Sequence, residues 1–139
     1  MINIEIKKTY QKTYPDLESH YTILMSEKFL LPTHQEVVNA VKRHSVKDMK
    51  YVSNIADCEK FAWYLVWGIQ KERSEQAEMF KVTWALGWIT GFRIDLLGQE
   101  SHTMVTAMTS DNGIIIIDPM TDAIMEPDIQ TFSALLLVM

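Results

Sequence analysis

One cysteine, one histidine and one aspartate follow each other along the chain in an order that could support nucleophilic catalysis. Cys58 stands at the predicted start of a helix, His102 opens a strand-like run, and Asp118 ends the next such run. A thiolate is a good nucleophile, and the unpaired N–H groups of a helix N-terminus favour negative charge. A neighbouring imidazole can hold the thiol proton, and a carboxylate on its far nitrogen fixes the tautomer. The three residues therefore form a candidate catalytic triad.

Each of the three residues also has an ordinary structural explanation. A lone cysteine in a helix is more often a small buried hydrophobic residue than a nucleophile. A histidine in a strand is more often a structural hydrogen-bonding residue than a base. An Asp-Pro pair such as Asp118-Pro119 is common where a strand ends, because proline has no backbone N–H to donate to the neighbouring strand. The catalytic hypothesis rests on the conjunction of the three residues.

Length and composition predict one soluble folded domain, residues 1–139. Apolar residues make up 47% of the chain and charged residues 22%, and the formal net charge of -5 disfavours a broad nucleic-acid surface. The single cysteine excludes an internal disulfide framework and a Cys-x-x-Cys metal knuckle. No run approaches the ~20 apolar residues needed to cross a bilayer. We therefore expect a cytoplasmic protein that does not enter a membrane.

The first half of the chain predicts mostly helices. Ile2, Ile4 and Ile6 alternate with polar residues, which indicates a half-buried strand. Residues 17–28 are expected to form a short helix. A capping box, Thr33-His34-Gln35-Glu36, predicts a helix over 34–44.

The next predicted helix begins at Cys58 and ends near residues 71–74, where charged residues take over, with Asn54 or Asp57 as its cap. It is apolar nearly all round, as expected of a buried central helix. Its core-facing stripe consists of Cys58, Phe61, Ala62, Leu65 and Ile69.

Three strands are predicted in the second half, over 79–93, 102–109 and 114–118, and a further strand over 132–139. Ser110-Asp111-Asn112-Gly113 is a strong hairpin turn. The predicted fold class is therefore α+β, with N-terminal helices and a buried central helix packed on an antiparallel sheet.

Three short motifs resemble those of the papain-like and transglutaminase-like cysteine hydrolases. They are Asp57-Cys58-Glu59-Lys60-Phe61-Ala62, Ser101-His102 and Asp118-Pro119. Small domains with this pattern include the peptidase domain of calcium-dependent fungal chimerolectins and related bacterial and phage proteins. The resemblance covers about residues 51–127. It implies a papain-like or transglutaminase-like fold in which Cys58 is the nucleophile, His102 the general base and Asp118 the orienting group.

The chain also departs from the family pattern. Papain-type enzymes complete the oxyanion hole with a glutamine shortly before the cysteine, and none stands there. Ser53 and Asn54 are the remaining candidates, together with the backbone N–H of Cys58. Losing one such donor typically costs roughly 10²–10³ in rate. The calcium requirement of the chimerolectin domains is not carried over, because no ligand set matches it.

The third member of the triad has two candidates. If Asp111-Asn112-Gly113 forms the hairpin loop, Ser110 opposes Ile114 and His102 opposes Asp122. Asp118 would then lie about 13 Å along the strand from His102, at ~3.3 Å per residue. The family pattern favours Asp118, and this simple pairing favours Asp122.

Two functions follow from these observations. The first is a cysteine hydrolase or acyltransferase that acts on an amide or thioester bond of a peptide or protein, without a cofactor or metal. The alternative is a non-catalytic protein-interaction module or inhibitor on the same fold. Such a module could be encoded by a phage. The four tryptophans exceed the usual need of a core this size, so one or two are expected in an exposed patch. The sequence indicates neither a substrate nor an oligomeric state.

Metal chemistry has little support in the sequence. The four histidines show no ligand spacing such as His-Glu-x-x-His. The acidic cluster Asp118, Asp122, Glu126 and Asp128 is expected to form a solvated loop, because a calcium site needs about 6–8 oxygens in a defined loop.

Overall fold

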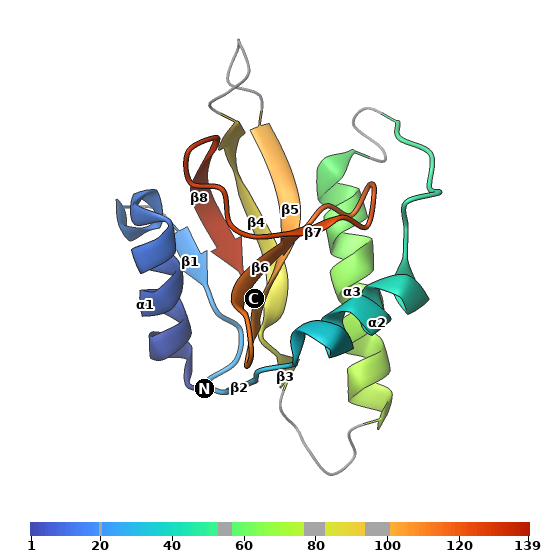
Figure 1. Ribbon diagram of the computed structural model, residues 1–139, viewed down its shortest axis with the longest axis horizontal. Coiled ribbons are helices and arrows are strands. Elements are labelled where there is room, and N and C mark those ends of the chain that lie inside the picture. Colours follow the sequence, from blue (N-terminus) through green and yellow to red (C-terminus); the bar gives the residue numbers. More distant parts are fainter. Residues whose placement is uncertain (20, 53–56, 77–82, 94–100) are drawn as a thin grey trace.

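A six-stranded sheet stands at the centre of the fold (Figure 1). The computed structural model describes residues 1–19, 21–52, 57–76, 83–93 and 101–139. The strands of the sheet, in spatial order, are β1 (Tyr21–Ile23), β8 (Phe132–Val138), β4 (Leu86–Arg93), β5 (Ser101–Thr109), β6 (Gly113–Ile117) and β7 (Ile124–Met125). Strands β1 and β8 pair in parallel, and the other neighbouring pairs are antiparallel.

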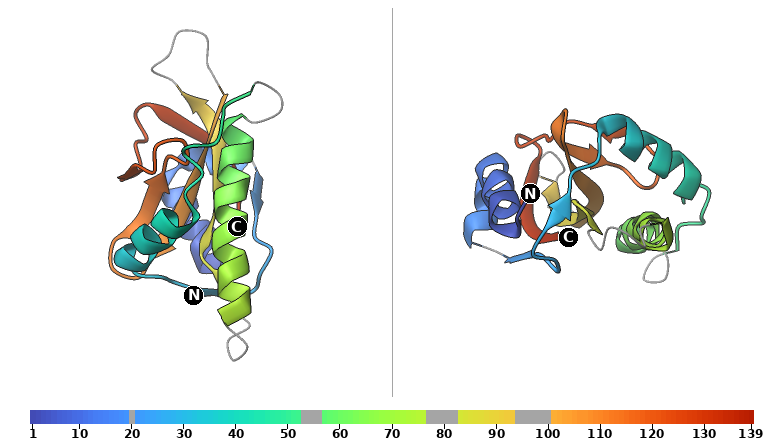
Figure 2. Two further views of the ribbon diagram at one scale, coloured as in Figure 1. Left: turned by 90° about the vertical axis from the view of Figure 1, so that its right-hand side faces the viewer. Right: turned by 90° about the horizontal axis from the view of Figure 1, so that it is seen from below.

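Helices cover both faces of the sheet (Figures 1 and 2). Helix α1 (Asn3–Thr13) and the 3₁₀ helix η1 (Pro15–Ser19) lie on one side, and α2 (His34–His44) and α3 (Cys58–Gln76) lie on the other. Strands β2 (Phe29–Leu30) and β3 (Thr83–Trp84) form a short parallel pair of their own. The observed fold class is α+β, as predicted. None of the helices in the described residues is long and apolar enough to cross a membrane.

The strands contribute alternate residues to two separate hydrophobic clusters, because successive side chains of a strand point to opposite faces of the sheet. The α1 cluster lies between α1 and the sheet and includes Ile6, Tyr10, Ile89, Met108, Ile114, Ile116, Phe132 and Leu137. The α3 cluster lies on the other face and includes Val37, Ala62, Leu65, Ile69, Leu86, Val105, Ala107, Ile115 and Ile117. The continuous apolar run of β6 is therefore covered on both faces, as predicted.

The strand predicted from Ile2, Ile4 and Ile6 is wrong, since this segment begins α1. Ile6 is fully buried, whereas Ile2 and Ile4 are exposed. Ile6 and Tyr10, four residues apart, form the buried face of the helix and pack on the sheet. Glu5 supports the helix start by accepting a hydrogen bond from the backbone N of Ile2 at 3.1 Å. Helical packing of these two side chains thus outweighs the local alternation.

The short helix predicted over 17–28 is also wrong. After η1 the chain forms β1, which extends the sheet next to β8 with Tyr21 opposite Leu136. The backbone N of Met139 donates to the carbonyl of Ile23 at 3.0 Å, and Met139 accepts from the N of Met25 at 2.8 Å. Backbone pairing with the distant C-terminal strand, which a local pattern does not contain, determines this segment.

The other main elements are confirmed. Helix α2 spans the predicted range, and Thr33 Oγ1 accepts from the backbone N of Glu36 at 3.2 Å. Helix α3 begins at Cys58 and ends slightly later than predicted. The prediction that it is buried all round is wrong, because only one face packs on the sheet and Trp63, Tyr64 and Trp67 are exposed on the other. The predicted strand over 79–93 is divided into β3 and β4, and residues 79–82 lie outside the described residues. The C-terminal segment forms strand β8, as predicted.

The register of the β5–β6 hairpin differs from the predicted one. Thr109 pairs with Gly113, so the loop consists of Ser110, Asp111 and Asn112. Gly113 adopts φ 67°, a conformation that favours glycine. Thr109 Oγ1 accepts from the backbone N of Asn112 at 3.1 Å and donates to the carbonyl of Gly113 at 2.9 Å. Gly113 thus begins the strand instead of closing the loop.

Candidate active site

Cys58 is the first residue of α3, and its side chain is half-buried. Asp57 precedes it and caps the helix: its backbone carbonyl accepts from the N of Phe61 at 3.1 Å, and its Oδ1 accepts from the N of Lys60 at 3.4 Å. The thiol therefore lies in the first turn, where the helix dipole favours negative charge. The carboxylates of Asp57 and Glu59 on either side oppose that effect.

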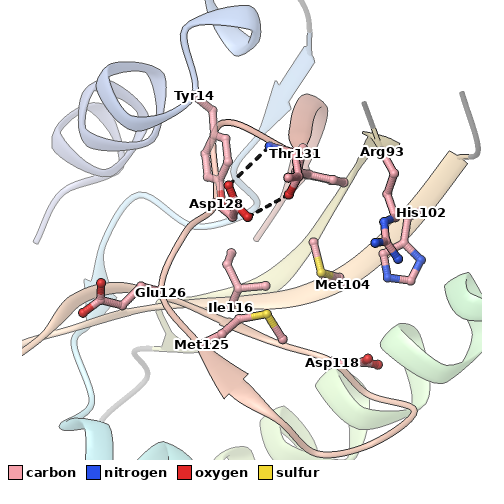
Figure 3. Close-up of a pocket in the computed structure, with 11 residues that line it drawn as sticks. Tyr14, Arg93, His102, Met104, Ile116, Asp118, Met125, Glu126, Asp128 and Thr131 are labelled. Carbon is pink, nitrogen blue, oxygen red and sulfur yellow. Dashed lines mark hydrogen bonds between the residues drawn. The ribbon is translucent and has the colours of Figure 1, made fainter. Parts of the chain in front are cut away.

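His102 and Asp118 line the same pocket, of about 310 Å³ (Figure 3). The ladder places Val105 opposite Ile117, and extending it by one residue places Met104 opposite Asp118. Asp118 is therefore a diagonal neighbour of His102 on the next strand, and such neighbours are typically ~7–8 Å apart. The hairpin register thus brings Asp118 two residues closer to His102 than the predicted loop did. The pocket is lined by Tyr14, Arg93, His102, Met104, Ile116, Asp118, Met125, Glu126, Asp128, Thr131 and Phe132.

The pocket has an apolar floor and charged side chains around it. Met104, Ile116 and Met125 lie in its middle, and Arg93 and His102 lie side by side at one end (Figure 3). Arg93 reaches His102 because Gly91 pairs with His102, which makes Arg93 a diagonal neighbour. This end of the pocket is suited to a ligand group that carries negative charge or accepts hydrogen bonds.

A second polar part of the pocket is built around Asp128. Its carboxylate accepts from Thr131 Oγ1 at 2.8 Å and from the backbone N of Gln130 at 3.0 Å. These hydrogen bonds, that of Thr131 first, hold the pKa of Asp128 below its usual range. Burial raises the pKa of Tyr14, and the nearby charge of Asp128 adds to this rise. At neutral pH this part of the pocket therefore presents a fixed carboxylate beside a protonated phenol.

Asp118 and Asp122 differ in what they contact. Asp118 Oδ1 accepts from the backbone N of Met120 at 2.9 Å, and its side chain lines the pocket with His102. Asp122 adopts φ 62° and accepts a hydrogen bond from Ser45 Oγ, which lies just after α2, at 2.5 Å. Asp122 is not one of the pocket-lining residues.

Cys58 is not among the described residues that line this pocket. Alternation along β5 places His102 on the face of Met104, toward α1, whereas α3 packs against the face of Val105 and Ala107. Both α3 and β5 nevertheless begin at the same end of the molecule, at the top of Figure 1. A contact between the thiol and the imidazole therefore has to form around this end of the sheet.

The proposed oxyanion donors Ser53 and Asn54 lie outside the described residues. Within the described residues, no group of three or more His, Cys, Asp or Glu side chains is placed to hold a metal ion.

Sequence reasoning missed several pocket residues, among them Tyr14, Arg93, Asp128 and Thr131. They come from three separate segments: Asp128 and Thr131 share one turn, in which Thr131 Oγ1 donates to Asp128, and no motif connects that turn with Tyr14 or Arg93. The one signal that could have found Arg93 was the pairing of β4 with β5, which places it diagonally to His102.

Solved structures that share this fold over the full length of the chain include two from Polyporus. The Polyporus chimerolectin PSL1a in complex with E64 matches 100% of this chain and 51% of its own, with TM-score 0.83 and 13% identity. A Polyporus squamosus lectin bound to the human-type influenza-binding epitope Neu5Aca2-6Galb1-4GlcNAc matches 100% of this chain and 49% of its own, with TM-score 0.83 and 14% identity. The chain thus spans about half the length of these proteins.

At this level of identity the matches show the fold, and they confirm the papain-like architecture predicted from the short motifs. No protein-family model matches the sequence, and no curated protein does.

Proposed function

We propose that this chain is a cysteine hydrolase or acyltransferase domain that acts on an amide or thioester bond of a peptide or protein. In this proposal Cys58 is the nucleophile, His102 the general base and Asp118 the group that orients the imidazole. The observation that carries the proposal is the full-length fold match to PSL1a, a protein seen in complex with the peptide-like inhibitor E64. The position of the only cysteine at the start of α3 supports it.

The proposed reaction has two steps. In the first, His102 takes the proton of the Cys58 thiol, and the sulfur attacks the carbonyl carbon of the substrate. The bond to the leaving amine or thiol breaks, the leaving group receives that proton from His102, and an acyl-thioester remains on Cys58. In the second step, water or an acceptor amine gives a proton to His102 and bonds to the acyl carbon; the C–S bond breaks, and the sulfur takes that proton back from His102. Hydrolysis and acyl transfer differ only in this acceptor.

The choice of Asp118 over Asp122 is supported by the contacts of the two carboxylates. Asp118 shares the pocket with His102, whereas Asp122 is hydrogen-bonded to Ser45. A carboxylate that orients an imidazole has to lie on the side of the ring away from the sulfur. In this proposal that carboxylate is Asp118.

Labelling of the single thiol tests the proposal directly. E64 carries an epoxide, which a thiolate opens by forming a C–S bond while the C–O bond breaks and the oxygen takes a proton. We expect the wild-type chain to gain one E64 by intact mass, and to react with iodoacetamide at pH 6 much faster than the unfolded chain. His102→Ala should slow labelling by about 10² or more, the usual range for a lost general base. His34→Ala, a change at the start of α2, is the matched control and should have no effect.

Two further variants identify the third residue. Asp118→Asn should lower the labelling rate at pH 6, and Asp122→Asn should leave it unchanged. The hydrolase proposal is excluded if Cys58 is labelled no faster than the thiol of the unfolded chain and if His102→Ala leaves its labelling rate unchanged.

A non-catalytic interaction module on the same fold is the second candidate. The observation that favours it is the exposed aromatic surface of α3, together with the two carboxylates that flank Cys58. An unreactive thiol in the labelling experiment would support this candidate.

A further inference from the structure

Three large aromatic side chains are exposed on the outer face of α3. Trp63 is 41% exposed, Tyr64 55% and Trp67 63%. At 3.6 residues per turn they lie on one side of the helix, opposite the buried Leu65 and Ile69. We refer to Trp63, Tyr64 and Trp67 as the aromatic stripe. A helix that buries one apolar face and exposes a second one presents a surface suited to another molecule.

Two lysines mark the ends of the aromatic stripe. Lys60 Nζ lies 5.2 Å from the ring centroid of Trp63, and Lys71 Nζ lies 5.0 Å from that of Trp67. Both are cation–π contacts, which hold the ammonium groups at the edges of the apolar surface. The two lysines are 11 residues apart, which corresponds to about 16 Å along the helix at ~1.5 Å per residue.

Nothing in the described part of the chain covers this face. Figure 2 (left) shows α3 at the front of the molecule with no described element before it. Trp63 contacts the sheet at one edge of the stripe, with its ring centroid 6.2 Å from that of Trp88. Within the described residues, the ion pair at this face is that of Glu75, whose Oε1 lies 3.9 Å from Lys71 Nζ in an exposed pair. Such a pair stabilises the helix little and is readily replaced by another carboxylate.

We propose that the aromatic stripe is the docking site for an acidic amphipathic helix of another protein. The apolar face of that helix covers Trp63, Tyr64 and Trp67, and its carboxylates pair with Lys60 and Lys71. Charge complementarity supports this partner, because the apolar surface is flanked by cations in a chain whose formal net charge is -5. The proposal is independent of the chemistry of Cys58, which lies on the opposite side of α3.

The same charges disfavour other occupants. In a two-fold dimer formed through α3, antiparallel packing about the centre of the stripe places Lys60 against Lys71 of the second copy. Parallel packing places each lysine against its own counterpart. Like charges opposite each other disfavour both arrangements. An anionic membrane surface is disfavoured by the net negative charge of the chain.

A pair of labelled helical peptides tests the proposal. Both carry leucines along one face; the acidic probe has glutamates 11 positions apart at the edges of that face, and the basic probe has lysines there. In fluorescence anisotropy at about 50 mM salt we expect the wild-type chain to bind the acidic probe at least about tenfold more tightly than the basic probe. Trp67→Ala should weaken binding by about tenfold, as for an exposed aromatic anchor. Tyr21→Ala, at an aromatic residue that is 74% exposed on β1, is the matched control.

The charge-swapped variant Lys60→Glu/Lys71→Glu provides the decisive comparison, because it should prefer the basic probe. Its substitutions are at the helix surface, and its folding is checked by circular dichroism. The proposal is overturned if wild type does not distinguish the two probes, or if the swap leaves the preference unchanged. It is also overturned if sedimentation shows a wild-type dimer that Trp67→Ala dissociates, or if Trp67→Ala removes binding to anionic vesicles while probe binding is unaffected.

Discussion

The carboxylate of Glu72 lies 2.5 Å from Nε2 of His44, and this contact joins α3 to the last residue of α2. Arg43 adds two hydrogen bonds from its Nε, at 3.0 and 3.3 Å, and one from Nη2 at 3.2 Å. The hydrogen bond of His44, followed by that of Arg43, lowers the pKa of Glu72 below its ordinary value of 4.5. One carboxylate at the surface thus ties together the two helices on that face of the sheet.

Removing this carboxylate should cost stability only where it is ionised. Because the folded-state pKa of Glu72 is lowered, its contribution is present above the unfolded value of 4.5 and is lost as the pH falls through the folded value. Glu72→Gln should therefore reduce the free energy of unfolding by about 0.5–1 kcal/mol at pH 7, as expected of a surface network. Urea denaturation at several pH values should show the difference disappearing in acid. Glu75→Gln, which breaks only the exposed Lys71–Glu75 pair, should change little.

A disulfide trap should measure whether Cys58 and His102 approach each other. Two cysteines form a disulfide when their Cβ atoms are about 3.5–4.5 Å apart. The proposed triad predicts that His102→Cys forms an intramolecular disulfide with Cys58 under mild oxidation, detected as a loss of about 2 Da by intact mass. Asp128→Cys places a thiol in the same pocket, on the segment before β8, and should remain reduced. An unlinked His102→Cys, or equal cross-linking of Asp128→Cys, would contradict the triad.

The buried hydrogen bond between Tyr10 and Thr106 should make two substitutions unequal. Tyr10 Oη lies 2.8 Å from Thr106 Oγ1, which itself donates to the carbonyl of Ile115 at 3.1 Å. Tyr10→Phe removes one donor and should cost about 0.5–1.5 kcal/mol, whereas Thr106→Val leaves a buried hydroxyl unpaired and should cost about 1–3 kcal/mol. Thermal unfolding followed by circular dichroism would compare them. Equal effects would show that the hydroxyl of Tyr10 finds another partner.

The same tyrosine should contribute to unfolding at alkaline pH. Burial raises the pKa of Tyr10, so it stays protonated in the folded state, whereas the unfolded chain ionises near 10.0. The stability that it confers is therefore present below pH 10 and is lost as the pH rises beyond that value. Tyr10→Phe should reduce the slope of stability against pH above 10 in urea titrations. An unchanged slope would assign the alkaline dependence to other groups.

Gly87 should not tolerate a side chain. A Cβ added there would lie 1.9 Å from the carbonyl oxygen of Val138 and 2.7 Å from Met139 Cα, both of which are backbone atoms that cannot turn away. Gly87→Ala should therefore cost about 3 kcal/mol or more. In Gly68→Ala the nearest atom is Nδ1 of the His44 side chain at 3.1 Å, so only a side chain, and not the backbone, has to shift by a few tenths of an ångström. That control should cost less than about 1 kcal/mol, measured by urea denaturation.

Elements with a local signature could be predicted from the sequence. The capping box of Thr33 and Glu36 gave the start of α2, and the apolar stripe that begins at Cys58 gave α3. The expectation that one or two tryptophans are exposed is confirmed, since Trp63 and Trp67 lie on the outer face of α3. These features depend on neighbours within about one or two turns of the same helix.

Features that depend on distant partners could not be predicted in this way. The alternation of Ile2 to Ile6 fits a strand, but contacts of Ile6 and Tyr10 with the sheet make it a helix. The sequence does not decide whether Gly113 belongs to the turn or to the strand. The structure places it in the strand, which shifts the hairpin register and brings Asp118 closer to His102. The second polar part of the pocket combines Tyr14 with Asp128 and Thr131, which only the folded chain brings together.

The position of β8 has a consequence for how the chain folds as it is synthesised. This last strand is inserted between β1, from the first part of the chain, and β4, from the middle. The cluster beneath α1 is completed by its residues Phe132, Ala134 and Leu137. Until β8 has left the ribosome, α1 has no finished surface to pack on, and β4 presents an open edge. Chaperones that shield such edges would therefore act on this chain mainly before its final strand emerges.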